Sequence, residues 1–382
     1  MRNPVLVTDT IRNSKNSCSK KEIQQLTSIA WGTMCKVVDT LVANGYLYTR
    51  KDTSPKTRGR PMIPICINAQ SAYFMGFDIG ASRTRVVVCD LNFNVVFRQE
   101  FATPYYKNSD SFFNWVFEAF DKVVDSGAFE REKLKGITLA VSGNVDPENG
   151  IIVSGGNWGV KWGTNLPVVE KLSAYANVPV SALSAPTAGV WAEYQFGRWH
   201  GCGNLITVGL GVGIGAGIVS NNRLLVSHPK CQVGYIGHML IPGNDHICTC
   251  GFRGCLESYS GGGYLTNVAK EIVPNRPELY SAEALDKAAE AGDKDAVAIM
   301  SKAASYNAVG IASMIQLYSP DALIFSGGQC KKDGFLFNQT LTELKNILPP
   351  ERLSRFEIGL TSLENYQSAL GAARIAYEKF FL

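Results

Sequence analysis

The residues of this chain with the most specific chemistry are one histidine and three cysteines between positions 238 and 255. His238 is followed ten residues later by the segment Cys248-Thr-Cys-Gly-Phe-Arg-Gly-Cys255. Three thiolates and one imidazole form the closed tetrahedral ligand set that Zn²⁺ takes in structural sites, which leave no position open for a substrate. We therefore expect one structural zinc ion per chain, held by His238, Cys248, Cys250 and Cys255.

The other seven of the ten cysteines are scattered along the chain. Scattered cysteines are typical of the reduced thiols of a cytoplasmic protein. No stretch approaches the roughly 18 apolar residues of a membrane-spanning helix, and the first residues have no secretory signal. We expect a cytoplasmic protein without a membrane partner.

The amino-terminal segment concentrates positive charge. Residues 1–70 contain eleven Lys or Arg and four Asp or Glu, a net charge of +7, which leaves −3 for the rest of a chain whose total is +4. A basic head on a mildly acidic body is typical of a module that binds a polyanion such as DNA. A solvated basic surface is the alternative that charge alone leaves open.

The residue pattern of the head predicts three short helices, over about 4–13, 19–26 and 30–43. Ser19, with Glu22 three residues later, forms a capping box at the start of the second helix. Two strands are expected over 46–50 and 62–68. From residue 73 onward strands and helices alternate around glycine-rich turns, which predicts an α/β fold.

Over nearly its whole length the chain resembles the ROK family, which groups repressors, open reading frames and sugar kinases. The segment from Gly237 to Glu257 contains the complete family signature, Gly-His followed by Cys-x-Cys-Gly-x-x-Gly-Cys-x-Glu. The resemblance implies an α/β fold in which a winged helix-turn-helix precedes a two-lobed actin-like, sugar-kinase-like (ribonuclease H-like) body. We assign residues 1–70 to the DNA-binding domain and 71–185 to the first lobe, with a C-terminal helix at about 366–382 packing back on it. Residues 186–365 form the second lobe, with the zinc site.

The resemblance to the repressor branch also implies which residues meet DNA. The core positions of its winged helix-turn-helix are matched by Ile23, Leu26, Ile29, Met34, Val38, Leu41 and Leu47. The recognition helix of such a module enters the major groove with its amino-terminal residues forward. In this chain these residues are Trp31, Gly32, Thr33, Cys35 and Lys36.

We expect Thr33 to hydrogen-bond a base edge or a phosphate and Lys36 to reach a phosphate. Trp31 either stacks on the sugar backbone or packs on a neighbouring helix. In the wing, Arg58 and Arg60 belong to the extended segment Arg-Gly-Arg-Pro, which is suited to a narrow minor groove. A solvated linker is the alternative for that segment.

Three glycine-rich turns resemble the nucleotide-binding loops of the family's kinases. The segment Phe77-Asp-Ile-Gly-Ala-Ser-Arg-Thr84 resembles the first phosphate loop, in which the Asp lies near Mg²⁺. The turn at 209–217 resembles the second, although Val212 stands where the kinases usually have Thr, and the turn at 326–328 resembles the adenosine side. The remnants of the nucleotide loops are Asp78, Gly80, Gly211, Gly213 and Gly215. Their spacing supports the fold strongly and ATP binding only weakly.

The residues that act on the sugar in the family's kinases are altered. The kinases have an Asn-Asp pair before a helix, and the Asp is the general base that takes a proton from the sugar hydroxyl. Ser184 and Ala185 occupy these positions, and Tyr235 replaces a Glu that orients the sugar. An alanine methyl group cannot accept a proton, so we expect no catalytic residue and no kinase activity. The remaining sugar contacts are Asn157, His238 and Glu257.

These features favour a DNA-binding transcriptional regulator, a repressor of carbohydrate-related genes, with a catalytically inactive kinase-like body. Its expected partners are a double-stranded DNA operator, further copies of the chain in a homodimer or tetramer, and a small carbohydrate effector or a protein. A sugar kinase of the ROK type with an appended DNA-binding domain is one alternative, against which Ser184, Ala185 and Tyr235 speak. The other is an interaction protein whose body docks another protein.

Overall fold

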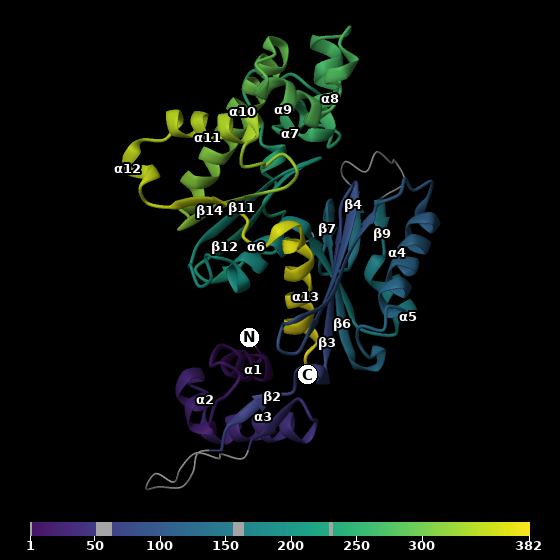
Figure 1. Ribbon diagram of the computed structural model, residues 1–382, viewed down its shortest axis with the longest axis vertical. Coiled ribbons are helices and arrows are strands. Elements are labelled where there is room, and N and C mark those ends of the chain that lie inside the picture. The colour runs from purple at the N-terminus through teal and green to yellow at the C-terminus, as the bar shows by residue number, and fades with distance from the viewer. Residues whose placement is uncertain (1, 51–62, 156–163, 229–231) are drawn as a thin grey trace.

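The structure of this chain is a computed structural model that describes residues 2–50, 63–155, 164–228 and 232–382. Figure 1 shows a small amino-terminal head below a larger body of two lobes, with the carboxyl terminus close to the head. Each lobe contains a five-stranded sheet with helices packed on it, so the expected α/β fold is present. Among the residues described, no helix is both long and apolar enough to cross a membrane.

The head consists of three helices and a two-stranded ribbon. Its elements are α1 (Asn3–Asn13), α2 (Lys20–Thr27), α3 (Trp31–Ala43), β1 (Leu47–Thr49) and β2 (Ile65–Ile67). β1 and β2 pair antiparallel, as in a wing, and residues 51–62 between them lie outside the described part. The side chain of Ser19 accepts a hydrogen bond from the Glu22 N–H, and the Glu22 carboxylate accepts one from the Ser19 N–H. This is the predicted capping box.

The core of the head differs from the expectation at one position. The predicted core residues that are buried are Ile23, Met34, Val38, Leu41 and Leu47, while Ile29 is half-buried. Leu26, which we expected to be part of the core, is 65% exposed, so that prediction was wrong. The physical reason is the length of α2. It is a two-turn helix whose one buried residue is Ile23, and its last turn, which contains Leu26, faces solvent.

The first lobe is a mixed sheet in the order β10-β6-β3-β4-β5. The strands are β3 (Tyr73–Ile79), β4 (Arg83–Asp90), β5 (Val95–Ala102), β6 (Leu134–Val141) and β10 (Val180–Ser184), and the helices are α4 (Ser109–Val124) and α5 (Val168–Ala176). A small side sheet contains β7 (Asn144–Asp146), β8 (Ile151–Ser154) and β9 (Thr164–Leu166). Phe77 of β3 packs with Phe112 of α4, whereas Phe74 packs on the other face against Tyr377 of the C-terminal helix. The strand is apolar on both faces because helices cover both.

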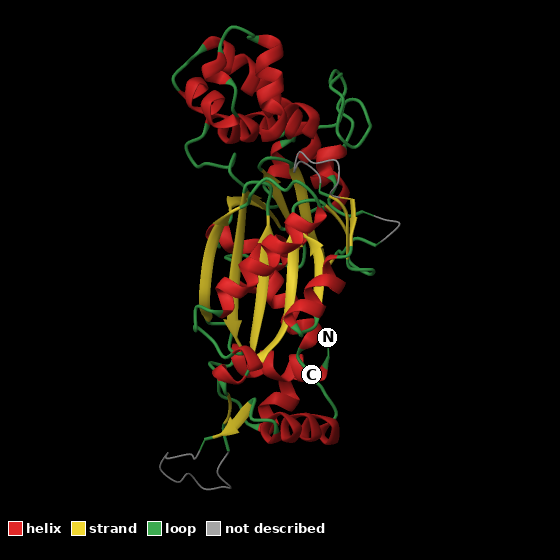
Figure 2. Cartoon of the chain, turned by 90° about the vertical axis from the view of Figure 1, so that its right-hand side faces the viewer, coloured by secondary structure: helices red, strands yellow, loops and turns green. Residues whose placement is uncertain are grey.

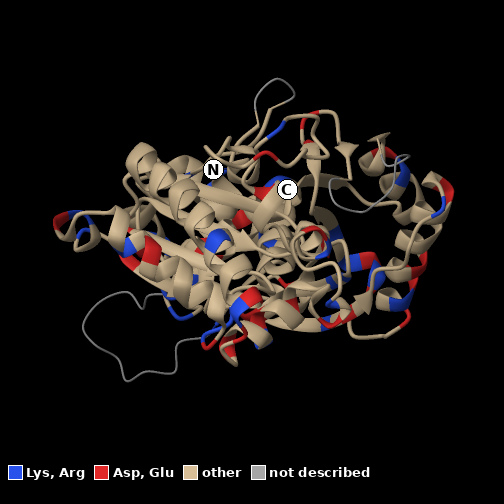
Figure 3. Ribbon diagram, turned by 90° about the horizontal axis from the view of Figure 1, so that it is seen from above, with Lys and Arg blue, Asp and Glu red and all other residues tan. Residues whose placement is uncertain are grey.

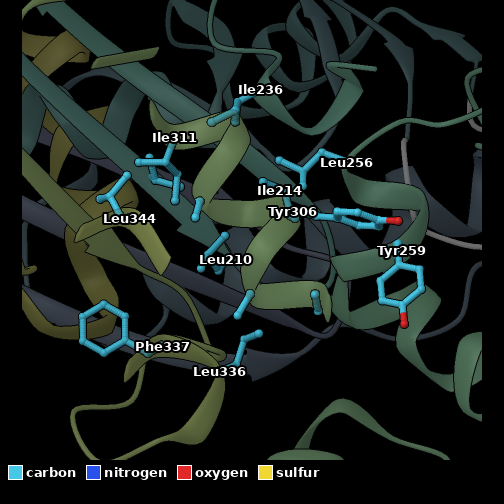
Figure 4. Close-up of a cluster of buried hydrophobic side chains, with 14 of the residues drawn as sticks. Leu210, Ile214, Ile236, Leu256, Tyr259, Tyr306, Ile311, Leu336, Phe337 and Leu344 are labelled. Atoms are coloured by element: carbon cyan, nitrogen blue, oxygen red, sulfur yellow. The ribbon is translucent and has the colours of Figure 1, made fainter. Parts of the chain in front are cut away.

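The second lobe is a sheet in the order β13-β12-β11-β14-β15 under a helical layer. The strands are β11 (Leu205–Leu210), β12 (Ile214–Ser220), β13 (Arg223–Leu224), β14 (Ala322–Ser326) and β15 (Glu357–Leu360). The helices are α7 (Glu257–Ser260), α8 (Gly262–Ile272), α9 (Ala282–Glu290), α10 (Lys294–Tyr318), α11 (Phe335–Ile347) and α12 (Pro350–Leu353). Figure 4 shows the core between these layers, in which Leu210 and Ile214 face Ile311 and Leu336.

Two helices lie where the lobes meet. They are α6 (Ala185–Phe196) and α13 (Gln367–Phe380), and α13 crosses the sheet of the first lobe on the face opposite α4. Figure 2 shows helices lying across the long strands. α6 and α13 approach each other closely. A Cβ added to Gly371 of α13 would lie only 1.9 Å from the Ala188 carbonyl oxygen of α6. The short 3₁₀ turns are η1 (Ala69–Ser71), η2 (Arg131–Lys133), η3 (Ile236–His238), η4 (Pro277–Leu279) and η5 (Glu364–Tyr366).

Candidate functional site

The four expected metal ligands lie together in the second lobe. His238 ends the turn η3, and Cys248, Cys250 and Cys255 lie on the loop that leads into α7. One ligand atom of each residue lies within 4.8 Å of those of the other three. The Cys248 Sγ is 3.6 Å from the His238 Nδ1, and the Cys250 and Cys255 sulfur atoms are 3.5 Å apart. This cluster can hold a metal ion.

Local backbone geometry makes the tight loop possible. Gly251 and Gly254 have φ of +93° and +87°, a region in which L side chains are strained, and a Cβ on Gly254 would lie 2.7 Å from the Asn244 carbonyl oxygen. The pKa of Cys248 is lowered below its ordinary value. Burial by itself raises it, but hydrogen bonds from His238 and from the Cys250 N–H favour the thiolate more strongly. A thiolate is the form of cysteine that binds a metal.

A cleft of about 900 Å³ between the lobes brings together residues that are far apart in the sequence. It is lined by all five remnants of the nucleotide loops, Asp78, Gly80, Gly211, Gly213 and Gly215, and by Ala185, Tyr235, His238 and Glu257. The predicted sugar contact Asn157 and the wing residues Arg58 and Arg60 lie outside the described residues. The structure therefore places two of the three expected sugar contacts in one cavity with the glycine-rich turns.

Glu257 connects the metal loop to the cleft. It lies two residues after Cys255, at the start of α7, and is buried. Its Oε2 accepts a hydrogen bond of 2.6 Å from the backbone N–H of Ile214, the first residue of β12 within the second glycine-rich turn. The loop that carries the metal ligands thus positions a carboxylate in the cleft, beside His238.

The position expected for a catalytic base is apolar. Ala185 is the first residue of α6, and its carbonyl oxygen accepts a hydrogen bond of 3.1 Å from Ser368. The hydroxyl of Ser184, immediately before it, lies 2.6 Å from that of Thr187 in the same helix turn. Neither side chain offers a carboxylate to the cleft, so these positions have no group of the type that takes a proton from a sugar hydroxyl in the kinases.

A feature that the sequence analysis missed is a guanidinium beside Asp78. The Arg85 Nη1 lies 3.8 Å from the Asp78 carboxylate, and the Arg85 Nε donates a 2.8 Å hydrogen bond to Glu100. Burial raises the pKa of Asp78 to about 7, although the Arg85 charge opposes this shift. Because the Arg85 guanidinium lies beside the carboxylate and Val212 in the second turn is apolar, this end of the cleft is poorly suited to a Mg²⁺–nucleotide complex. The strand alternation of β4 places Arg85 on this face.

The expected DNA-reading residues lie on the exposed side of α3. Trp31, Gly32, Thr33 and Lys36 are exposed, and Cys35 is half-buried. The opposite side of the helix packs into the head through Met34, Val38 and Leu41. Trp31 is 53% exposed, so about half of its surface is open to solvent.

Charged residues of both signs are spread over the surface and do not single out the cleft or α3. Figure 3 shows Lys and Arg interspersed with Asp and Glu around the molecule. Exposed ion pairs such as Lys20–Asp39 in the head, with side chains 36% and 66% exposed, contribute little to stability. The net charge of +7 belongs to residues 1–70 as a whole, and the DNA-facing side of α3 is assigned from which of its residues are exposed.

Comparison with known proteins places the chain in a family. The pattern described as ROK family matches residues 74–379. A xylose repressor of Caldicellulosiruptor bescii is 26% identical over 354 residues, which cover 90% of this chain and 87% of the relative. The crystal structure of a ROK family transcriptional regulator, a homologue of the E. coli MLC protein, matches with a TM-score of 0.81 at 20% identity and covers 99% of this chain and 96% of that one. A ROK family glucokinase from Streptomyces griseus in complex with glucose and AMPPNP matches with a TM-score of 0.66 at 23% identity, over 80% of this chain and 100% of its own. Because the family pattern spans most of its residues, this chain belongs to the ROK family.

Proposed function

We propose that this chain is a DNA-binding repressor of carbohydrate-related genes whose cleft binds a small carbohydrate without phosphorylating it. The observation that carries the proposal is the free amino-terminal side of α3 on a head of net charge +7. Gly32 is informative, because a Cβ at this position would meet nothing within 4 Å and the fold does not require a glycine. An exposed helix start with no side chain at Gly32 is suited to close approach to a groove of DNA.

The proposed contacts divide into two kinds. Thr33 reads a base edge and Lys36 contacts a phosphate from α3, while Arg58 and Arg60 enter the minor groove from the wing. Because such heads read two half-sites, we propose that the protein acts as a homodimer or tetramer on a double-stranded operator. Similarity to a xylose repressor over 90% of the chain supports this assignment.

The cleft supports a sensor in preference to a kinase. Ala185 removes the proton acceptor, Arg85 places a positive charge 3.8 Å from the carboxylate that would face Mg²⁺, and Tyr235 replaces an acidic sugar contact. His238 and Glu257 remain in the cavity as groups that hydrogen-bond hydroxyls, and we propose that they contact the carbohydrate. We further propose that the ion in the neighbouring cluster is Zn²⁺ and that its role is structural.

The test uses the full-length chain. Operator sequences are selected from random double-stranded DNA, and the affinity of wild type is compared with those of Thr33→Ala and of Lys345→Ala, a control on an exposed position of α11 in the body. We expect Thr33→Ala to lose discrimination between selected and random DNA, at a cost of about 1 kcal/mol for one hydrogen bond, and Lys345→Ala to behave as wild type. Failure of the wild type to enrich any sequence would refute the proposal.

A further inference from the structure

A buried chain of charged side chains joins the head to the body. Arg374 of α13 is 2% exposed, and its Nη1 and Nη2 atoms lie 2.9 and 2.5 Å from the two carboxylate oxygens of Asp9 in α1. The Arg374 Nε donates a 2.8 Å hydrogen bond to Glu378, which also accepts bonds of 3.1 Å from the Trp191 indole of α6. Asp9, Arg374 and Glu378 are thus all paired, as a buried guanidinium requires.

A second set of contacts surrounds the buried Asp9–Arg374 ion pair. The Arg12 side chain forms an ion pair with Asp9, donates a 2.7 Å hydrogen bond to the Leu91 carbonyl oxygen, and lies 4.8 Å from the ring centre of Phe93. The Phe93 ring stacks at 5.3 Å on Phe196, the last residue of α6. The head therefore contacts the last residue of α6 through Phe93 and the carboxyl-terminal half of α13 through Asp9.

The head and the body also share one hydrophobic core. Val5 and Ile11 of α1 are fully buried in the same cluster as Phe74, Tyr377 and Phe381 of the body. The Tyr377 hydroxyl donates a 3.2 Å hydrogen bond to the Val5 carbonyl oxygen. This shared core keeps the head on α13, while the two parallel hydrogen bonds between Arg374 and Asp9 fix its orientation there.

The opposite ends of the same two helices line the cleft. Ser184 and Ala185 at the start of α6, and Gln367 and Ser368 at the start of α13, are part of its wall, and the Ser368–Ala185 hydrogen bond joins them. Between the two ends α13 packs closely on α6 and on β3. The Gly371–Ala188 contact described above is one close approach, and a Cβ on Gly76 of β3 would lie 1.9 Å from the Ala369 carbonyl oxygen. Packed interiors of this kind shift as units and do not deform gradually.

We propose that occupancy of the cleft controls DNA binding through α6 and α13, and that the Asp9–Arg374–Glu378 chain transmits the shift to the head. The inference rests on the proposed function and specifies how it is regulated. A ligand that draws the lobes together moves the joined starts of α6 and α13. Because Asp9 is held by two hydrogen bonds to α13, the head moves with the helix, and the two heads of a dimer lose the spacing that the operator requires.

The experiment compares full-length wild type, Asp9→Ala and Asp39→Ala. Asp39→Ala is the matched control, since it also removes one acidic group of a head ion pair, but that pair is exposed and lies within the head. Hydrogen exchange of α1 amides and affinity for the selected operator are measured without and with D-xylose, D-glucose or N-acetyl-D-glucosamine. Exchange of the 209–217 turn, which lines the cleft, reports sugar binding independently.

We expect at least one sugar to slow exchange in the 209–217 turn of all three proteins. In wild type and Asp39→Ala it changes operator affinity at least tenfold and alters α1 exchange. In Asp9→Ala the affinities with and without sugar agree within twofold, because Arg374 no longer holds the head. Trp191→Phe, which removes the indole N–H contacts with Glu378 and keeps a smaller aromatic ring in place, gives an intermediate response and serves if Asp9→Ala does not fold.

Two results would overturn the inference while leaving the proposed function intact. One is a wild-type tenfold response retained in both Asp9→Ala and Trp191→Phe. The other is specific DNA binding by wild type that no sugar of the panel changes in affinity or in α1 exchange. Absence of specific DNA binding by wild type is a separate result, because it refutes the proposed function itself.

Discussion

Replacement of Cys255 by serine should remove the metal ion and destabilise the second lobe. Cys255 is fully buried, and the next residue, Leu256, is part of the core shown in Figure 4. The loop before it has little apolar interior of its own, since Leu240, Ile247 and Phe252 are 61%, 66% and 64% exposed. Once the metal is lost, the loop keeps hydrogen bonds such as that from the Asn244 side chain to the Cys255 carbonyl oxygen, and the core contact of Ile241.

The size of the effect follows from linkage between metal binding and folding. At a free zinc concentration about 1,000 times the dissociation constant, a ligand that binds only the folded state adds about 4.1 kcal/mol to the free energy of unfolding. The entropy of unfolding is about 2.1 cal/mol/K per residue, and the family domain spans residues 74–379. Loss of the ion should therefore lower the Tm of the body by about 6 °C.

The measurement compares wild type, Cys255→Ser and Cys202→Ser. Cys202 is a half-buried thiol outside the metal cluster, so its replacement controls for the loss of a cysteine. Elemental analysis should find about one zinc per chain in wild type and Cys202→Ser and much less in Cys255→Ser. A chelator should lower the Tm of wild type toward that of Cys255→Ser. Freshly purified wild type without zinc, or a Tm that chelation does not change, would refute the reasoning.

Three further predictions concern the head and the cleft. Lys36→Ala should reduce the slope of log affinity against log salt by about 0.9, whereas Lys345→Ala should leave it unchanged; equal slopes would remove Lys36 from the interface. The Asp78 pKa of about 7 lies above the unfolded value of about 3.9, so the stability that this group supplies is complete below about pH 4 and is lost as pH rises through 7. Asp78→Asn should therefore increase the free energy of unfolding at pH 8 by up to about 4 kcal/mol, with a corresponding rise in Tm. At pH 4 it should leave Tm unchanged, and an equal rise in Tm at both pH values would contradict this. An assay of ADP release over hexoses and N-acetylhexosamines should detect no turnover, and turnover lost in Glu257→Gln would show a working kinase.

The local features of the molecule could be read from the sequence because short-range chemistry determines them. The metal ligands lie within eighteen positions, with glycines where the loop requires positive φ, so His238 and the three cysteines could be grouped before any fold was known. The start of α2 is likewise set by Ser19 and Glu22, three residues apart. The exposure of Leu26 could not be read in the same way, because periodicity does not show where the covering elements end.

Long-range contacts required the tertiary structure. Asp78, Ala185 and Glu257 share a cleft only because two lobes close around it, and Arg85 meets Asp78 only through the pairing of β3 with β4. The ion pair between Asp9 and Arg374 joins residues 365 positions apart, and neither residue has a neighbour in sequence that indicates a partner. Sequence patterns determined which residues could bind a metal or face DNA, because spacing along a helix or loop is a local property. Which buried charges meet depends on packing of the whole chain, since such groups are tolerated only where the fold brings an opposite charge to them.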